Sequence, residues 1–109
     1  MRLVYVESPY AGDVERNVQY ARACLADCLR RGEAPFASHL LYTQEGILDD
    51  LIEGERMKGI LAGFAWGKYA DATVVYVDLG ISSGMQLGIL NAREANRPVE
   101  YRSLPEFLN

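Results

Sequence analysis

The sequence predicts a single α/β domain built on a short parallel sheet. Its 109 residues suffice for one domain, and a hydrophobic content of 50% is enough for one core. Short β-branched runs alternate with segments of helical periodicity, as in parallel sheets with right-handed crossovers. The apolar run TVVYV at residues 73–77 is typical of a strand covered on both faces.

The first third of the chain contains two of the predicted strands and one helix. Residues Arg2–Glu7 form a β-branched and aromatic run, and the proline and glycine that follow indicate a tight loop. Apolar residues then recur at helical spacing from Val14 onward, and Gly32 after two arginines predicts the end of that helix. A short second strand is expected at residues 34–38.

A loop and a second long helix are expected in the middle of the chain. Residues 39–49 show no clear period, so we expect an irregular loop whose length suggests a functional role. Asp50 and Glu53 have the spacing of a capping box, with aspartate in the serine role. They predict a helix that runs to about Lys68.

This helix carries a glycine stripe. Gly59, Gly63 and Gly67 follow at four-residue steps, although each glycine weakens a helix by about 1 kcal/mol relative to alanine. The stripe therefore indicates close packing against another element, which is either the sheet or a second subunit. We expect a homo-oligomer, at least a dimer. Trp66 on the same helix is expected in the core or at an interface.

The last third contains a helix between two strands. Ser83 and Gln86 have the spacing of a second capping box, which opens a helix to about Glu94. Val99–Arg102 is then expected as the last strand. The complete order predicts a Rossmann-like domain, with four parallel strands in the order 2-1-3-4 and helices on both faces.

Composition excludes several classes of protein. A net charge of -4 with scattered Lys and Arg gives no footprint for duplex nucleic acid. No stretch approaches the length of a membrane span or the apolar region of a signal peptide, so we expect a cytoplasmic protein with no membrane partner. Cys24 and Cys28 share a helix face and are expected to be reduced and packed. With His39 as the sole histidine, we expect no metal and no cofactor.

A ligand pocket is expected at the carboxyl ends of the strands, where open α/β sheets bind their ligands. If the first strand lies beside the third, Glu7 and Asp78 follow neighbouring strands and could face one pocket. The helix that begins near Ser83 offers free amides to a phosphate or carboxylate. This anion site would comprise Ser82, Ser83, Gly84 and Met85.

Other candidate residues each have a structural interpretation beside the functional one. Gln86 either belongs to the ligand site or only caps its helix. His39 is either a ligand-binding or catalytic residue or a loop residue with its hydrogen bonds satisfied. Arg56 either pairs with a nearby acid or binds an anion. Tyr10, in the tight loop with Ser8 and Pro9, is placed to stack on a ligand.

Two segments resemble a known superfamily. YVESPY at residues 5–10 resembles the Y-x-A-G-P opening of the nucleoside 2-deoxyribosyltransferase-like superfamily, and GMQLG at residues 84–88 resembles its G-M-E-L-G signature. Asp71 before the third strand also fits. PFASHLL at residues 35–41, with the later acidic and arginine residues, is similar to phage and bacterial domains of unassigned function in that superfamily.

The chain also departs from this pattern at the residues that carry the chemistry. The resemblance implies that the nucleophilic glutamate of the transferases is replaced by Gln86, whose neutral amide is no nucleophile. Related domains often carry an acid two residues later, where this chain has Gly88. Glu7 stands where the superfamily usually has a small residue, so the carboxylate could have moved there.

Three functions remain open from the sequence. The first is a protein that binds a nucleotide or a nucleotide derivative, such as an ADP-ribose-type signal, to sense or sequester it. The alternative is an N-glycoside hydrolase or deoxyribosyltransferase that uses Glu7 or Asp78 as the relocated carboxylate. The third is a structural or interaction module in which the glycine-striped helix matters more than a pocket.

Overall fold

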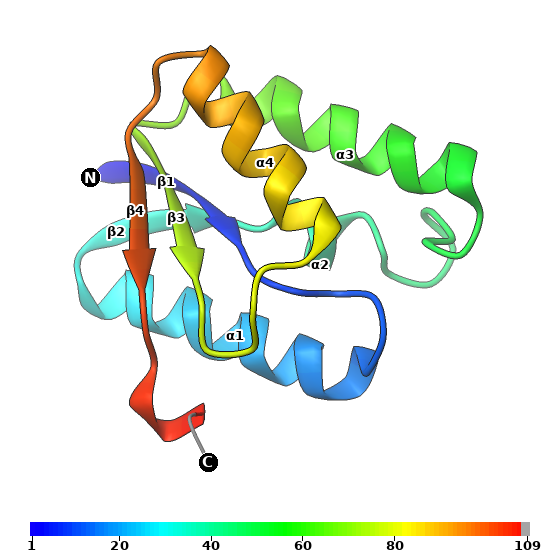
Figure 1. The fold of residues 1–109 in the computed structure, drawn as a ribbon, viewed down its shortest axis with the longest axis horizontal. Helices are drawn as coiled ribbons and strands as arrows, with labels where there is room; N and C mark the ends of the chain where they lie inside the picture. The colour runs from blue at the N-terminus through cyan, green and yellow to red at the C-terminus, as the bar shows by residue number, and fades with distance from the viewer. Residues whose placement is uncertain (108–109) are drawn as a thin grey trace.

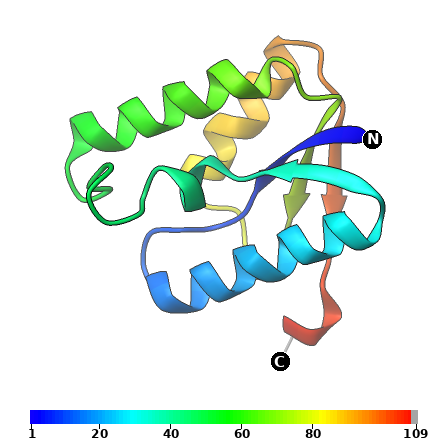
Figure 2. The same ribbon diagram turned by 180° about the vertical axis from the view of Figure 1, so that it is seen from behind.

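A computed structural model describes residues 1–107. It contains one parallel sheet of four strands in the order β2-β1-β3-β4, with α1 on one face and α3 and α4 on the other (Figures 1 and 2). This is the predicted architecture. The elements are β1 (Arg2–Glu7), α1 (Val14–Arg30), β2 (Glu33–Phe36), α2 (Ser38–Leu41), α3 (Glu53–Gly67), β3 (Ala72–Tyr76), α4 (Ser83–Glu94), β4 (Val99–Arg102) and a final 3-10 turn, Pro105–Phe107.

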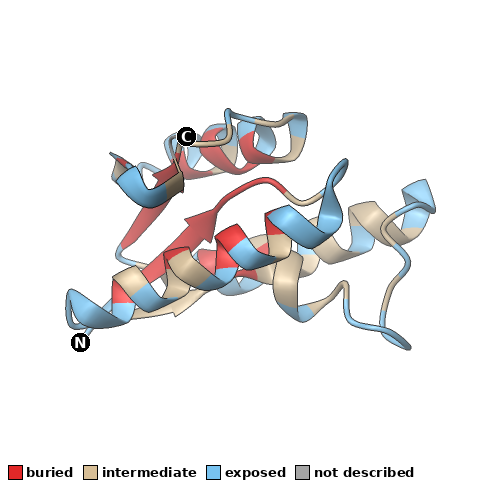
Figure 3. Ribbon diagram, turned by 90° about the horizontal axis from the view of Figure 1, so that it is seen from below, coloured by how far each residue is buried: buried red, intermediate tan, exposed pale blue. Residues whose placement is uncertain are grey.

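Strand alternation assigns side chains to the two faces of the sheet. Val4 and Val6 of β1, with Val74 and Tyr76 of β3, pack against α1 and its buried cysteines. On the other face, Val75 packs against α4. Figure 3 shows buried residues concentrated on the strands and on the inward sides of the helices. Both cysteines are free and buried, which confirms the prediction that they are reduced and packed.

The 34–53 region differs most from the sequence prediction. β2 ends at Phe36, and Ser38–Leu41 forms the single helical turn α2, whereas we predicted strand up to residue 38 and irregular loop after it. One turn is too short to show a period. The capping box at Asp50 is wrong, because α3 begins at Glu53 with Ile52 at the N-cap and no side-chain cap.

The cap of α4 lies one residue earlier than predicted. Ser82 is the N-cap, and its hydroxyl accepts a hydrogen bond from the Met85 amide at 3.3 Å. The Met85 sulfur in turn contacts the Ser82 amide at 3.4 Å. Ser83 is therefore the first helical residue, and Gln86 is exposed and takes no part in the cap.

The glycine stripe of α3 packs inside the domain. A Cβ at Gly63 would lie 2.4 Å from the Tyr5 hydroxyl and 2.6 Å from Ser38, and one at Gly67 would lie 3.1 Å from the Tyr5 ring. The stripe thus lets α3 approach β1 and α2. Of the two predicted packing partners, the sheet and a second subunit, the structure shows the sheet. Trp66 is exposed on the outer side, 6.2 Å from the Phe36 ring, and so is not in the core. The homo-oligomer stays a prediction.

No helix within residues 1–107 has the length and apolar character needed to cross a membrane. Over the same residues, no group of three or more metal-ligating side chains comes together.

Candidate functional site

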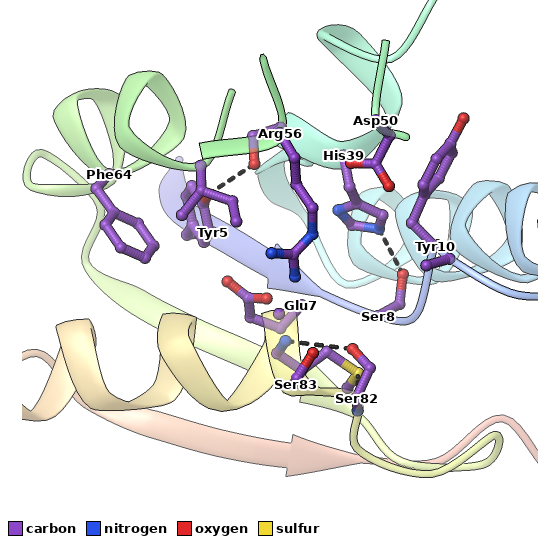
Figure 4. A pocket seen from close by; sticks show the side chains of 15 residues that line it. Tyr5, Glu7, Ser8, Tyr10, His39, Asp50, Arg56, Phe64, Ser82 and Ser83 are labelled. Carbon is purple, nitrogen blue, oxygen red and sulfur yellow. Dashed lines mark hydrogen bonds between the residues drawn. The ribbon is translucent and has the colours of Figure 1, made fainter. Parts of the chain in front are cut away.

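A cavity of about 90 Å³ opens at the carboxyl end of β1, between α2, α3 and the start of α4 (Figure 4). It lies where the sequence predicted a pocket, and most of the predicted site residues line it. Pro9 and Gln86 do not, since Pro9 is buried outside the lining and Gln86 is exposed on α4. The predicted residues in its lining are Glu7, Ser8, Tyr10, His39, Arg56, Ser82, Ser83, Gly84 and Met85.

Glu7 is the buried acid of the cavity. It ends β1 opposite Val75, so its side chain points to the α4 face and retains 7% exposure. Within residues 1–107 no hydrogen bond or ion pair joins its carboxyl to another group. Burial raises the pKa of Glu7 to about 8, although the positive charge of Arg97 acts in the opposite direction. Glu7 is therefore largely protonated at neutral pH.

Gly88 provides the space for this carboxyl. A Cβ built at Gly88 would lie 2.0 Å from Oε2 of Glu7 and 2.4 Å from its carboxyl carbon, so any side chain there would displace Glu7. The carboxyl of β1 thus fills the volume that a side chain on α4 would otherwise occupy. The absence of an acid at position 88 and the presence of one at position 7 are parts of a single packing arrangement.

Ser8 and His39 form a hydrogen-bonded pair beside Glu7. The Ser8 Oγ lies 2.7 Å from Nε2 of His39, and Ser8 is only 4% exposed. The single turn α2 brings the histidine to this position, and Thr43 stabilises the turn by donating a hydrogen bond to the His39 carbonyl at 2.5 Å. Burial lowers the pKa of His39 to about 4, so the imidazole is neutral at neutral pH.

The Arg56 guanidinium and the N-terminus of α4 lie close together at the cavity. The Arg56 side chain of α3 points toward the first turn of α4, and its Nη2 lies 3.4 Å from the position of a Cβ on Gly84 (Figure 4). Its one ion pair within residues 1–107 is with exposed Glu53 at 3.8 Å. Within residues 1–107, the Ser83 and Gly84 amides at the start of α4 have no hydrogen-bond partner. The Met85 amide donates to the Ser82 hydroxyl, so the prediction that it is free to bind an anion is wrong.

Asp78 does not share this cavity. Its carboxylate accepts hydrogen bonds from the Tyr20 hydroxyl at 2.6 Å, the Ser103 hydroxyl at 2.5 Å and the Leu104 amide at 2.7 Å. These bonds hold the pKa of Asp78 below its ordinary value against the opposing effect of burial. The structure therefore gives Asp78 a role in joining α1 to the C-terminal segment, and separates it from Glu7.

Asp50 is a site residue that sequence reasoning missed. It lines the cavity beside His39, and it also lines a wider neighbouring hollow of about 590 Å³ formed by Tyr10 and the loop before α3. Its spacing to Glu53 predicts a helix cap, so Asp50 is not among the residues predicted for the site. Asp50 does not cap α3, and it lines both the inner cavity and the outer hollow.

Comparison with known proteins places the fold and the family. The chain has the fold of the nucleoside deoxyribosyltransferases: it superposes with a TM-score of 0.64 on a solved 2-deoxyribosyltransferase from the psychrotolerant bacterium Bacillus psychrosaccharolyticus. The two chains are 18% identical, over 93% of this chain and 72% of the other. Residues 2–102 match the family described as Domain of unknown function (DUF7768), and the chain belongs to it. No curated protein matches the chain in sequence.

Proposed function

We propose that the cavity binds the sugar of a nucleoside or nucleotide and that Glu7 takes part in cleaving its N-glycosidic bond. The observation that carries the proposal is the buried Glu7 carboxyl, which faces the cavity with no partner in the described chain. Its oxygens reach the open cavity and are not sealed within the protein. Acids whose pKa is raised by burial in a cleft are concentrated at functional sites.

The protonation state of Glu7 supports the role of general acid. With a pKa of about 8, the carboxyl holds a proton at neutral pH and can deliver it to the departing base. Proton transfer of this kind typically contributes about 10²–10⁴-fold to a rate. A buried, protonated carboxyl is less suited to attack the sugar as a nucleophile, so the proposal favours the hydrolase over the deoxyribosyltransferase.

The cationic side of the cavity supports a phosphorylated substrate. Arg56 and the start of α4 bring two positive features close together, an arrangement that an anionic ligand would stabilise. The outer hollow beside Tyr10 has the size of a ligand site and offers an aromatic ring for stacking. We therefore propose a nucleotide, or a nucleotide derivative of the ADP-ribose type, ahead of a free nucleoside.

A second candidate function is binding without turnover, in which the protein senses or sequesters the nucleotide. It is favoured by Gln86, which the resemblance of residues 84–88 to the G-M-E-L-G signature would put at the position of the transferase nucleophile, and which is neutral and exposed outside the cavity. The two functions share one pocket and differ only in the fate of the ligand.

One incubation separates them. Ribo- and 2′-deoxyribonucleosides, their 5′-monophosphates and cyclic ADP-ribose are incubated with wild type, Glu7→Gln and the exposed control Glu94→Gln, and free and heat-released fractions are separated by chromatography. Cleavage predicts free base from wild type and the control, with a loss of at least about 100-fold in Glu7→Gln. Intact ligand recovered from the heat-released fraction would instead support binding alone.

A further inference from the structure

Glycoside hydrolysis needs a second group besides the acid. The leaving base takes a proton from one side, while the attacking water must be held on the other side of the sugar and must lose a proton. Within the described chain, Asp78 is unavailable because its carboxylate is occupied by Tyr20, Ser103 and Leu104. The question is which group in the lining accepts the proton of the water.

We propose that Ser8 and His39 form this pair, in which the Ser8 hydroxyl holds the attacking water and His39 accepts the proton through it. The inference rests on the proposed function, since it assigns the nucleophile side of the same site. In this arrangement Ser8 contacts the reacting water, and the proton passes from the water through Ser8 to His39.

The geometry carries this assignment. Glu7 and Ser8 are consecutive at the end of β1, and both line the cavity, so an acid and a hydroxyl face the same small space. Its volume of about 90 Å³ leaves room for a water, whose share of liquid volume is about 30 Å³, beside a ligand group. Ser8 is almost fully buried, and the 2.7 Å contact to His39 leaves the serine lone pairs free for a water donor.

The chemistry balances with these residues alone. The water oxygen bonds to the anomeric carbon as the bond from that carbon to the base nitrogen breaks, and the bonding electron pair leaves with the base. Glu7 transfers its proton to that nitrogen. The water proton passes to the Ser8 oxygen as the serine proton moves to Nε2 of His39, and solvent then returns Glu7 and His39 to their starting states.

A weak base is sufficient for this step. The transition state has oxocarbenium-like character, so the sugar carbon is already strongly electrophilic when the water arrives. Burial lowers the pKa of His39 to about 4, so the imidazole is neutral at neutral pH, and in the tautomer with its proton on Nδ1 the Nε2 atom accepts from Ser8. His39 acts through Ser8 and is thus a positioning and proton-accepting residue.

The test compares Ser8→Ala and His39→Gln with Ser103→Ala, an exposed serine outside the cavity lining. Base release is measured with the same ribo- and deoxyribonucleoside 5′-monophosphates, and kcat and KM are determined separately. Removing a proton path should lower kcat by about 10²-fold or more with little change in KM. Melting temperatures identify any variant that fails to fold, in which case Ser8→Gly and His39→Asn replace it.

A second readout separates water handling from a structural role. Methanol is added, and the ratio of methyl glycoside to free sugar is measured for each variant. If Ser8 holds the water, Ser8→Ala should shift this ratio toward methanol by several-fold, whereas Ser103→Ala should match wild type.

Each outcome decides a different claim. Wild-type base release with a loss of kcat and a shifted ratio in Ser8→Ala supports the pair. Base release that survives in Ser8→Ala and His39→Gln within about threefold, with an unchanged ratio, overturns the pair and leaves Glu7 as the proposed acid. No base release by wild type from any of these nucleotides overturns the cleavage proposal, and the water-activating pair with it.

Discussion

Replacing Glu7 by glutamine should stabilise the fold, and by more as the pH rises. Below about pH 4.5 the carboxyl is protonated in both folded and unfolded chains. Between that pH and about 8 the unfolded chain loses this proton while the folded chain keeps it, so wild-type stability falls as pH increases. At about 1.36 kcal/mol per pH unit, the cost at neutral pH is about 3 kcal/mol. A glutamine at position 7 does not ionise, so the variant does not have this pH-dependent cost.

Urea unfolding at about pH 5, 7 and 9 measures this difference as the gap between the free energies of unfolding of the two proteins. The gap should be small near pH 5 and should grow to about 3 kcal/mol or more near pH 9. Other titrating groups are common to both proteins and cancel. Glu94→Gln, on the exposed side of α4, should show no such growth. A gap that stays constant across the range would show that Glu7 is not held protonated by burial.

Three further predictions concern neighbouring positions. Gly88→Ala should displace the Glu7 carboxyl, so its effect on stability should differ between wild type and a Glu7→Ala background, a coupling that a double-mutant cycle of unfolding free energies would detect; additive effects would contradict the shared packing. Asp78→Asn should lower stability by about 1–3 kcal/mol in thermal unfolding while base release persists, and a selective loss of kcat would return Asp78 to the site. Gly84→Val should displace Arg56 and weaken binding of a nucleoside monophosphate in calorimetry while the fold survives; unchanged affinity would place the phosphate elsewhere.

The sheet could be predicted because its signals are local and repeated. β1 and β4 have the predicted bounds, and β3 is displaced by one residue, because β-branched runs ended by polar or turn residues identify strands with little ambiguity. The alternation of strands and helices predicts that the strands are parallel, although it does not by itself select the order 2-1-3-4. Both predictions depend on regularities that extend over several residues.

The details of the site depend on single residues and were harder to predict. The position of Asp78 after a strand predicts the same role as for Glu7, but the register pairs Glu7 with Val75 on the α4 face. Tyr76 lies on the opposite face, and the same alternation carries Asp78 toward α1, where Tyr20 binds it. Counting residues in register could have separated the two acids before the structure was known.

Helix caps were predicted in the wrong place for a similar reason. Ser82 and Ser83 are adjacent, and either hydroxyl can cap a helix. Gln86 gives Ser83 the sequence form of a capping box, whereas Met85 gives Ser82 none, so the local pattern favours Ser83 without excluding Ser82. The structure chooses Ser82 because Met85 is buried against Val75, and this fixes the phase of α4. Packing in the core thus decided a question that local sequence left open.

The pH dependence of base release tests the central claim that a protonated Glu7 is the acid of the site. With a suitable nucleotide, kcat/KM should stay high at neutral pH and fall tenfold per unit above about pH 8, where Glu7 loses its proton. Glu7→Gln should lack both the activity and this alkaline limb, whereas Glu94→Gln should reproduce the wild-type profile. A wild-type profile that stays level through about pH 10, or a Glu7→Gln variant that retains base release, would contradict the account.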